Sequence, residues 1–234
     1  MSALPLRLEG ARLVRGGRDL VGPVDLTLGA GGLTAVIGPN GSGKTSLLRL
    51  MHGLRPAQGR VRWAVPEAEA RPRQAYVFQR PVVLRRSVAA NLAYPLRLRG
   101  MRRDDARARA EAQAAAFGLG AALDQNAASL SGGELQRLAL ARALITEPEV
   151  LFADEPCAAL DGRATREIEA RLADAAARAT VVLATHDMGQ ARRIASRVLF
   201  LLHGRVYEDA PAAAFFAGPR TEAARAFLRG DIVE

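Results

Sequence analysis

The chain is poor in cysteine and has no long apolar run. Its 234 residues include a single cysteine, Cys157, so an intrachain disulfide is impossible, and one thiol suits a reducing compartment. No stretch of 18 consecutive apolar residues occurs, which argues against a membrane span. The first ten residues contain Pro5, Arg7 and Glu9 and lack the apolar region of a secretory signal. We therefore expect any work at a membrane to be done through a partner.

Lysine is almost absent, although the chain is basic. Lysine and arginine total 33 against 24 aspartate and glutamate, which gives a formal charge of +9, and Lys44 is the only lysine. The arginines are scattered, as a compositional bias toward Ala, Gly and Arg would leave them. An anionic partner such as nucleic acid or acidic lipid is the alternative explanation, but no basic block supports it. A lysine that persists in this composition marks a position that needs its side chain.

The order of apolar patterns predicts an α/β protein with a mostly parallel sheet. Apolar residues make up 49% of the chain and charged residues 24%, which is a globular balance. Short apolar runs typical of strands alternate with helical patterns outside the middle of the chain. The predicted strands are 4–8, 20–28, 33–37, 59–65, 75–78, 150–153, 181–184 and a hairpin over 198–207, and the predicted helices are 44–53, 165–179, 188–195 and 221–228.

The middle of the chain is helical in pattern. Residues 103–117 are rich in Ala and Arg without Gly or Pro, and residues 134–146 form an amphipathic pattern. We therefore predict one domain over residues 1–234, with a core of residues 1–79 and 149–234. An α-helical subdomain of about residues 80–148 would be inserted into that core.

The strongest local motif follows the predicted strand 33–37 and opens a predicted helix. It consists of Gly38, Pro39, Asn40, Gly41, Ser42, Gly43, Lys44 and Thr45. Its glycines let backbone N–H groups approach nucleotide phosphates, and the helix N-terminus adds positive potential. Lys44 would bridge the β- and γ-phosphates, and the Thr45 hydroxyl would coordinate Mg²⁺. A plain glycine-rich turn is the alternative, which the full spacing disfavours.

Two further motifs lie at the end of a predicted strand and at the start of a predicted helix. Strand 150–153 is followed by Asp154 and Glu155, and paired carboxylates after a buried strand need a reason because burying charge is costly. Asp154 would hold Mg²⁺ through water, and Glu155 would act as general base. Ser131, Gly132 and Gly133 precede a helix and form an anion nest, although Ser131 with Glu134 also fits a simple capping box.

Together these residues resemble the ATP-binding-cassette family of ATPases over nearly the whole chain. Residues 38–45 resemble its phosphate loop, 130–134 its signature sequence and 150–155 its Mg²⁺-binding strand. Gln79 resembles its Q-loop glutamine, Ala159-Leu160-Asp161 its D-loop and His186 its switch histidine. The resemblance implies a P-loop NTPase (RecA-like) fold with a mostly parallel sheet core, an N-terminal antiparallel β part and the inserted helical subdomain.

The resemblance also implies a mechanism. Two cassettes would face head to tail around two ATP molecules, and Ser131, Gly132 and Gly133 of one copy would contact the γ-phosphate held by the other. Gln79 would sense Mg²⁺ and the attacking water, His186 would contact the γ-phosphate, and Asp161 would cross the dimer interface. The cofactors implied are ATP and Mg²⁺.

The sequence departs from the family pattern at three places. Arg15 stands where an aromatic side chain usually stacks on adenine, and a guanidinium plane also stacks on a base but leaves base selectivity open. Glu134 replaces the commonest glutamine of the signature. Cys157 and Ala158 replace a Thr-Ser pair before the D-loop.

Three classes of protein compete. An unrelated phosphate-loop enzyme such as a kinase fails on the signature sequence, and a cassette ATPase acting on nucleic acid or the ribosome remains the alternative. The resemblance favours the ATPase subunit of an importer, bound peripherally at the cytoplasmic face of the cell membrane to permease subunits and, through them, to a substrate-binding protein. Residues 80–100 resemble cassettes of oxyanion importers of the tungstate, molybdate or phosphate type, with tungstate as first choice. No nucleic acid is expected as a partner.

Overall fold

The computed structural model describes residues 2–158 and 160–231, and its contacts divide the chain into two compact units. The first unit comprises residues 1–76, 149–155 and 171–234, and the second comprises residues 77–148 and 156–170. The helical subdomain predicted at about 80–148 falls inside the first segment of the second unit. The assignment of residues 1–234 to one domain stays a prediction.

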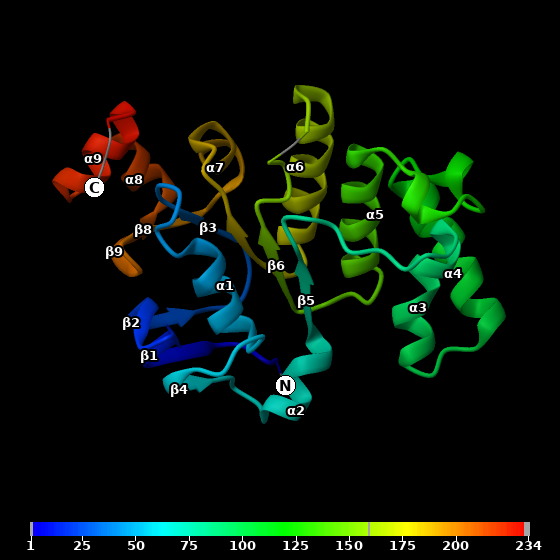
Figure 1. Ribbon diagram of the computed structural model, residues 1–234, viewed down its shortest axis with the longest axis horizontal. Helices are drawn as coiled ribbons and strands as arrows, with labels where there is room; N and C mark the ends of the chain where they lie inside the picture. The colour runs from blue at the N-terminus through cyan, green and yellow to red at the C-terminus, as the bar shows by residue number, and fades with distance from the viewer. Residues whose placement is uncertain (1, 159, 232–234) are drawn as a thin grey trace. The chain divides into compact units, whose positions relative to one another are not determined.

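The first unit contains two sheets (Figure 1). The smaller sheet has the strand order β2-β1-β4, and both of its pairings are antiparallel. The larger has the order β5-β6-β7-β3-β8-β9, in which β6, β7, β3 and β8 run parallel and β9 returns antiparallel. The strands are β1 (Leu6–Arg15), β2 (Arg18–Leu28), β3 (Leu33–Ile37), β4 (Gln58–Arg62), β5 (Gln74–Val77), β6 (Val150–Asp154), β7 (Thr180–Ala184), β8 (Arg197–Leu202) and β9 (Arg205–Pro211). The predicted mostly parallel core and antiparallel N-terminal part are confirmed.

Helix α1 (Lys44–His52) joins both sheets in one hydrophobic core. Its Leu47, Leu48 and Met51 are fully buried together with Phe152 of β6 and Leu199 of β8. Strands β3, β6 and β7 are buried along their whole length, as parallel strands covered on both faces are. The carboxyl end of β3 therefore leads straight into the glycine-rich loop from a rigid position.

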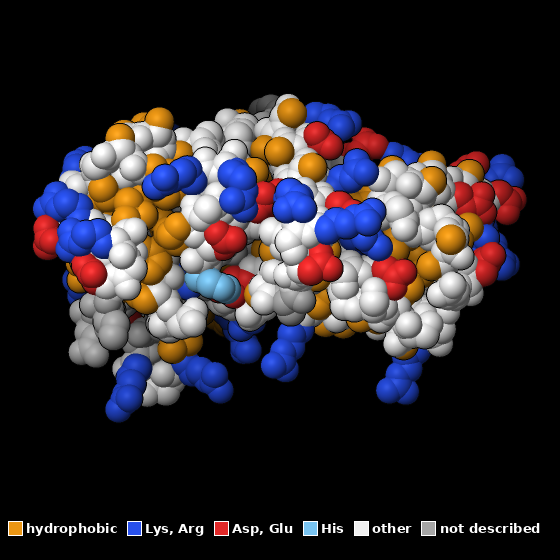
Figure 2. All heavy atoms as spheres, turned by 90° about the horizontal axis from the view of Figure 1, so that it is seen from above, with side chains coloured by type: hydrophobic (Ala, Val, Ile, Leu, Met, Phe, Trp, Pro, Cys, Tyr) orange, Lys and Arg blue, Asp and Glu red, His pale blue; other side chains and the backbone are white. Residues whose placement is uncertain are grey.

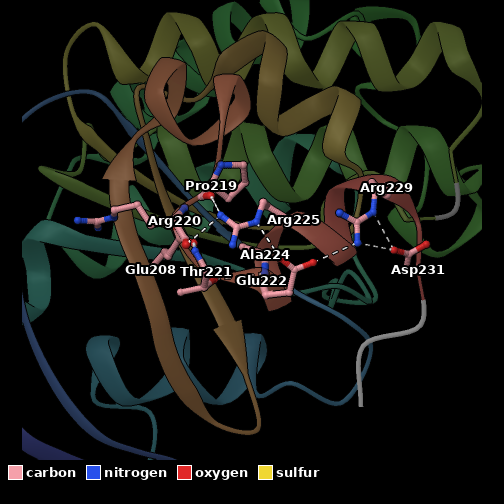
Figure 3. A network of polar contacts seen from close by, with 9 residues as sticks. All are labelled: Glu208, Pro219, Arg220, Thr221, Glu222, Ala224, Arg225, Arg229 and Asp231. Atoms are coloured by element: carbon pink, nitrogen blue, oxygen red, sulfur yellow. Dashed lines mark hydrogen bonds and ion pairs between the residues drawn. The ribbon is translucent and has the colours of Figure 1, made fainter.

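The remaining helices of this unit are α2 (Glu67–Ala70), η1 (Arg71–Arg73), α7 (Met188–Ile194), α8 (Ala212–Ala217) and α9 (Glu222–Arg229). Figure 3 shows how α9 is attached to β9. The buried Glu208 carboxylate accepts hydrogen bonds from the backbone N–H of Arg220 and from the N–H and hydroxyl of Thr221. Burial raises the pKa of Glu208, but these hydrogen bonds outweigh it and leave the pKa below its ordinary value. The C-terminal helix is thus fixed to the sheet by a charged group.

The second unit is helical. Its elements are α3 (Val88–Leu98), α4 (Arg103–Ala116), η2 (Gly120–Ala122), η3 (Ala127–Ser129) and α5 (Gly132–Leu144), and α6 (Gly162–Ala176) begins in it and ends in the first unit. Ala106, Ala110 and Ala114 recur every four residues and form the buried stripe of α4. The sequence did not predict α3, since Pro95 lies inside it and proline usually interrupts a helix.

On the face drawn in Figure 2, positively charged side chains are interspersed with acidic and uncharged ones, and several project from the lower edge. On this face the basic residues are thus spread out, as the scattered arginines of the sequence indicate.

Candidate functional site

The loop of residues 38–45 between β3 and α1 has a backbone that only glycine permits at two points. Gly38 has φ of 152°, and a Cβ there would lie 2.0 Å from the carbonyl oxygen of Leu201. Gly43 has φ of 103°, and a Cβ would lie 2.8 Å from the carbonyl oxygen of Leu20. The loop is also anchored from outside, because the N–H of Gly204 donates to the Ser42 carbonyl at 2.8 Å. The sequence motif thus becomes a fixed, tightly wrapped loop.

Lys44 is folded back onto this loop. Its Nζ donates to the carbonyl oxygens of Gly38 and Pro39 at 2.9 and 3.0 Å, and it lies 3.8 Å from Oε1 of Glu155. The side chain is only 6% exposed. Burial lowers the pKa of Lys44, while the charges of Glu155 and Asp154 oppose the shift. The ammonium group therefore sits at the centre of the loop with carboxylates as its nearest counter-charges.

Asp154, at the end of β6, accepts two side-chain hydrogen bonds. The hydroxyl of Thr45 donates to Oδ1 at 2.8 Å, and the phenol of Tyr76 on β5 donates to Oδ2 at 3.1 Å. Burial raises the pKa of Asp154, and the two hydrogen bonds act against the rise. The predicted pair Thr45 and Asp154 is therefore brought together, whereas the sequence analysis did not name Tyr76.

Glu155 follows in a constrained backbone conformation. Its φ is 46°, unusual for a residue with a side chain, and its N–H donates to the carbonyl of Ala184 at 2.9 Å. Oε2 lies 3.2 Å from Nδ1 of His186, which is half exposed. The structure thus brings Lys44 and His186, which are far apart in the sequence, to the carboxylate of Glu155.

One hydroxyl in the loop lacks a partner. Ser42 is 3% exposed, and its Oγ makes no hydrogen bond within the described residues. A buried hydroxyl without a partner is uncommon, because its desolvation is not compensated. Its place in the loop suits a ligand that supplies oxygen acceptors.

The signature residues belong to the second unit. Ser131 caps α5 and forms a capping box with Glu134: its Oγ accepts the Glu134 N–H at 3.4 Å, and its own N–H donates to Glu134 Oε2 at 2.9 Å. The Ser131 hydroxyl also donates to the same carboxylate at 2.6 Å. Gly132 and Gly133 form the first turn of α5. The capping interpretation is therefore confirmed for this structure.

Gln79 and Asp161 also lie in the second unit. Gln79 follows β5 and is exposed. Asp161 is exposed as well, and its Oδ1 accepts the N–H groups of Arg163 and Ala164 at the start of α6. Of the D-loop motif, Ala159 lies outside the described residues.

Arg15 ends β1 at a tight turn. Gly16 and Gly17, both with positive φ, connect it to Arg18 across the hairpin. Its side chain is exposed and has no hydrogen bond or ion pair among residues 2–158 and 160–231. The next strand leads to Leu20, whose carbonyl lies against Gly43, so the hairpin adjoins the phosphate loop.

This fold and this loop define a class: a phosphate-loop nucleotide-binding ATPase with a parallel sheet core. The family model described as ABC transporter matches residues 21–158. The chain belongs to the ABC transporter family, whose ATP-binding members are ATPases coupled to transport. Among the described residues, no helix has the length and apolarity to cross a membrane.

Known relatives share most of the chain. It is 38% identical to the tungstate uptake system ATP-binding protein of Peptoclostridium acidaminophilum, over 82% of this chain and 92% of that protein. It is 41% identical to a nickel import ATP-binding protein of Rhodobacter capsulatus, over 90% of both. The solved structure of cbiO1 from Clostridium perfringens, part of the ABC transporter complex cbiONQ, superposes with a TM-score of 0.81 at 25% identity, covering 97% of this chain and 96% of that one.

Proposed function

We propose that the chain is the ATP-hydrolysing subunit of an importer and that its catalytic centre is built around Glu155. The observation that carries this proposal is that Lys44 and His186 each lie at one oxygen of the Glu155 carboxylate. Lys44 also donates to the Gly38 carbonyl of the glycine-rich loop. ATP is the substrate, and binding of ATP is a property of the family.

Nucleotide binding would exchange the internal contacts of Lys44 for phosphate oxygens. The Nζ that now donates to the Gly38 and Pro39 carbonyls would donate to the β- and γ-phosphates, and the loop amides of residues 38–45 would cradle them. The Ser42 hydroxyl would gain the acceptor it lacks. Arg15 would lie over the base at the edge of the site.

The residues at the end of β6 fit Mg²⁺. The described residues contain no group of three or more His, Cys, Asp or Glu that could hold a metal. Mg²⁺ needs no such group, because it is usually held by one or two protein oxygens, substrate phosphates and water. Thr45 already donates its proton to Asp154, which leaves its oxygen lone pairs for an ion. When bound, the ion would neutralise charge on the phosphates, with Gln79 as a further contact.

Hydrolysis would use Glu155 as the general base. Its carboxylate would orient a water and take its proton, and His186 would contact the γ-phosphate. The second half of the site would come from another copy of the chain, whose Ser131, Gly132 and Gly133 face the γ-phosphate and whose Asp161 crosses the interface. The Ser131 hydroxyl would then exchange Glu134 for a phosphate oxygen.

We propose permease subunits as the membrane partners, a substrate-binding protein acting through them, and a peripheral position at the cytoplasmic face of the cell membrane. The cargo proposed is an oxyanion, with tungstate as first choice. The tungstate relative and the character of residues 80–100 support this choice, and the nickel relative of similar identity makes nickel the competing cargo.

The cargo test uses the chain assembled with its permease and binding protein in liposomes. We expect ATP hydrolysis to rise when the binding protein is loaded with tungstate and to stay at its basal rate with nickel. Stimulation by nickel alone would overturn the oxyanion proposal. Stimulation by RNA or ribosomes, without any response to a loaded binding protein, would favour the alternative ATPase class.

A further inference from the structure

Tyr76, which belongs to none of the sequence motifs, donates a hydrogen bond to Asp154. We propose that Tyr76 is a positioning residue for the Mg²⁺ site. The inference rests on the proposed function, in which Thr45 and Asp154 hold the ion. The phenol of Tyr76 donates to Asp154 Oδ2 at 3.1 Å, while Thr45 donates to Oδ1 at 2.8 Å. Each carboxylate oxygen thus has its own donor, one on the side of the phosphate loop and one on β5.

The hydrogen bond from Tyr76 affects the hydrogen bond from Thr45, because both are made to the same carboxylate. A carboxylate with donors on both oxygens has a fixed plane, and that plane decides where the Thr45 hydroxyl must point its proton. The lone pairs of Thr45 are then not used by Asp154 and stay available to an ion. Tyr76 therefore sets the direction of the Thr45 lone pairs through Asp154, without touching the nucleotide.

Two neighbouring rings, those of Phe152 and His52, hold the phenol of Tyr76 in place. The Tyr76 ring stacks on Phe152 with centroids 6.3 Å apart and meets His52 edge-on at 5.5 Å, and His52 meets Phe152 edge-on at 5.6 Å. Burial lowers the pKa of His52 to about 4, with the charge of Arg71 adding to the effect, so the imidazole is neutral at neutral pH. The Tyr76 ring therefore packs against two uncharged rings, which restrict its rotation away from Asp154.

The experiment measures nucleotide affinity and not turnover. A fluorescent ATP analogue is titrated into wild-type protein and the Tyr76→Phe variant, once with EDTA and once with Mg²⁺. Tyr76→Phe keeps the ring and removes one donor, so Asp154 Oδ2 loses its partner. We expect affinity in EDTA to stay within about twofold and the gain in affinity on adding Mg²⁺ to fall about tenfold, the loss expected from one hydrogen bond to a charged group.

The matched control is Tyr207→Phe. Tyr207 on β9 packs against Phe200, and its hydroxyl makes no hydrogen bond within the part of the chain that the structure describes. We expect its Mg²⁺-dependent gain to equal that of the wild type. In an Asp154→Ala background, Tyr76→Phe should have no further effect on this gain, because the residue acts only through Asp154.

Three results would overturn the inference. They are an unchanged Mg²⁺-dependent gain in Tyr76→Phe, an equal loss of affinity with and without Mg²⁺, and a full effect of Tyr76→Phe in the Asp154→Ala background. The second would assign Tyr76 a merely structural role. Failure of the proposed function looks different, since wild-type protein would then show no Mg²⁺-dependent gain at all.

Discussion

The phosphate loop in the first unit and the signature sequence in the second unit differ in whether their ligand-binding side chains are already buried and held in place. In the first unit, Lys44 and Asp154 are nearly inaccessible, and each is held by hydrogen bonds from or to the loop that the nucleotide would occupy. In the second unit, Ser131 and Asp161 are exposed, and their polar atoms are used to cap their own helices. The phosphate-loop side is thus a built site, whereas the signature side is a pair of ordinary helix N-termini.

This difference indicates that most of the free energy of nucleotide binding comes from the first unit. A preformed site loses little conformational freedom on binding, so the first unit should bind nucleotide by itself. The signature side gains a function only if phosphate oxygens from another copy replace Glu134 at Ser131. Substitutions in the two regions should therefore have different consequences.

The largest effect is expected from Lys44→Ala. It removes the only ammonium group in the loop, and charge-assisted contacts to phosphate in a water-poor site are worth several kcal/mol. Binding and hydrolysis of ATP should both collapse. Calorimetric titration measures this, and Arg60→Ala, which removes one exposed positive charge on β4, is the control that should bind normally. Normal ATP binding by Lys44→Ala would contradict the claim that the phosphate loop is a preformed site and the signature sequence is not.

A smaller effect on the isolated chain is expected from Ser131→Ala. The substitution breaks the capping box, so the free energy of unfolding should fall by about 1 kcal/mol, while ATP affinity of the monomer stays unchanged. Thermal and urea denaturation measure the first and titration the second. The control is Ser129→Ala, an exposed serine just before the signature. A loss of monomer ATP affinity in Ser131→Ala alone would mean that the signature side already acts in cis.

The smallest effect concerns the base. Because Arg15 is exposed and has no polar partner to orient it, we expect ATP and GTP to bind within about tenfold of each other, or about 1.4 kcal/mol. Competition binding measures this ratio. Arg15→Tyr should increase the preference for ATP, and Arg18→Tyr on the other side of the turn should not. A much stronger ATP preference in the wild type would assign base recognition to another residue.

Motifs that lie within one segment were predictable from the sequence. The strand 33–37, the loop and the helix that follows were predicted almost to the residue, because glycine spacing and apolar runs are local signals. Glu155 was predicted from the carboxylate pair after strand 150–153 and His186 from the family resemblance, as two separate residues. Only the parallel pairing of β6 with β7 brings them to 3.2 Å.

Features that depend on neighbours in space were missed. Helix α3 was not predicted because Pro95 obscured its pattern, although Ser87 caps it and five of its side chains are buried. Tyr76 was missed because it looks like any aromatic residue of a buried strand, and its partner Asp154 lies 78 positions away. The only available signal was that its strand ends just before Gln79.

The measurement that tests the account most directly is ATP-dependent dimerisation of the Glu155→Gln variant, followed by light scattering. Glutamine keeps the size of the side chain and removes the general base, so ATP should bind without turnover and two copies should stay closed around it. Adding Ser131→Arg to the same chain should abolish the dimer, because bulk and charge then occupy the γ-phosphate contact. The account predicts a dimer in the first variant and a monomer in the second. Unimpaired hydrolysis by Glu155→Gln, or a dimer insensitive to Ser131→Arg, would contradict it.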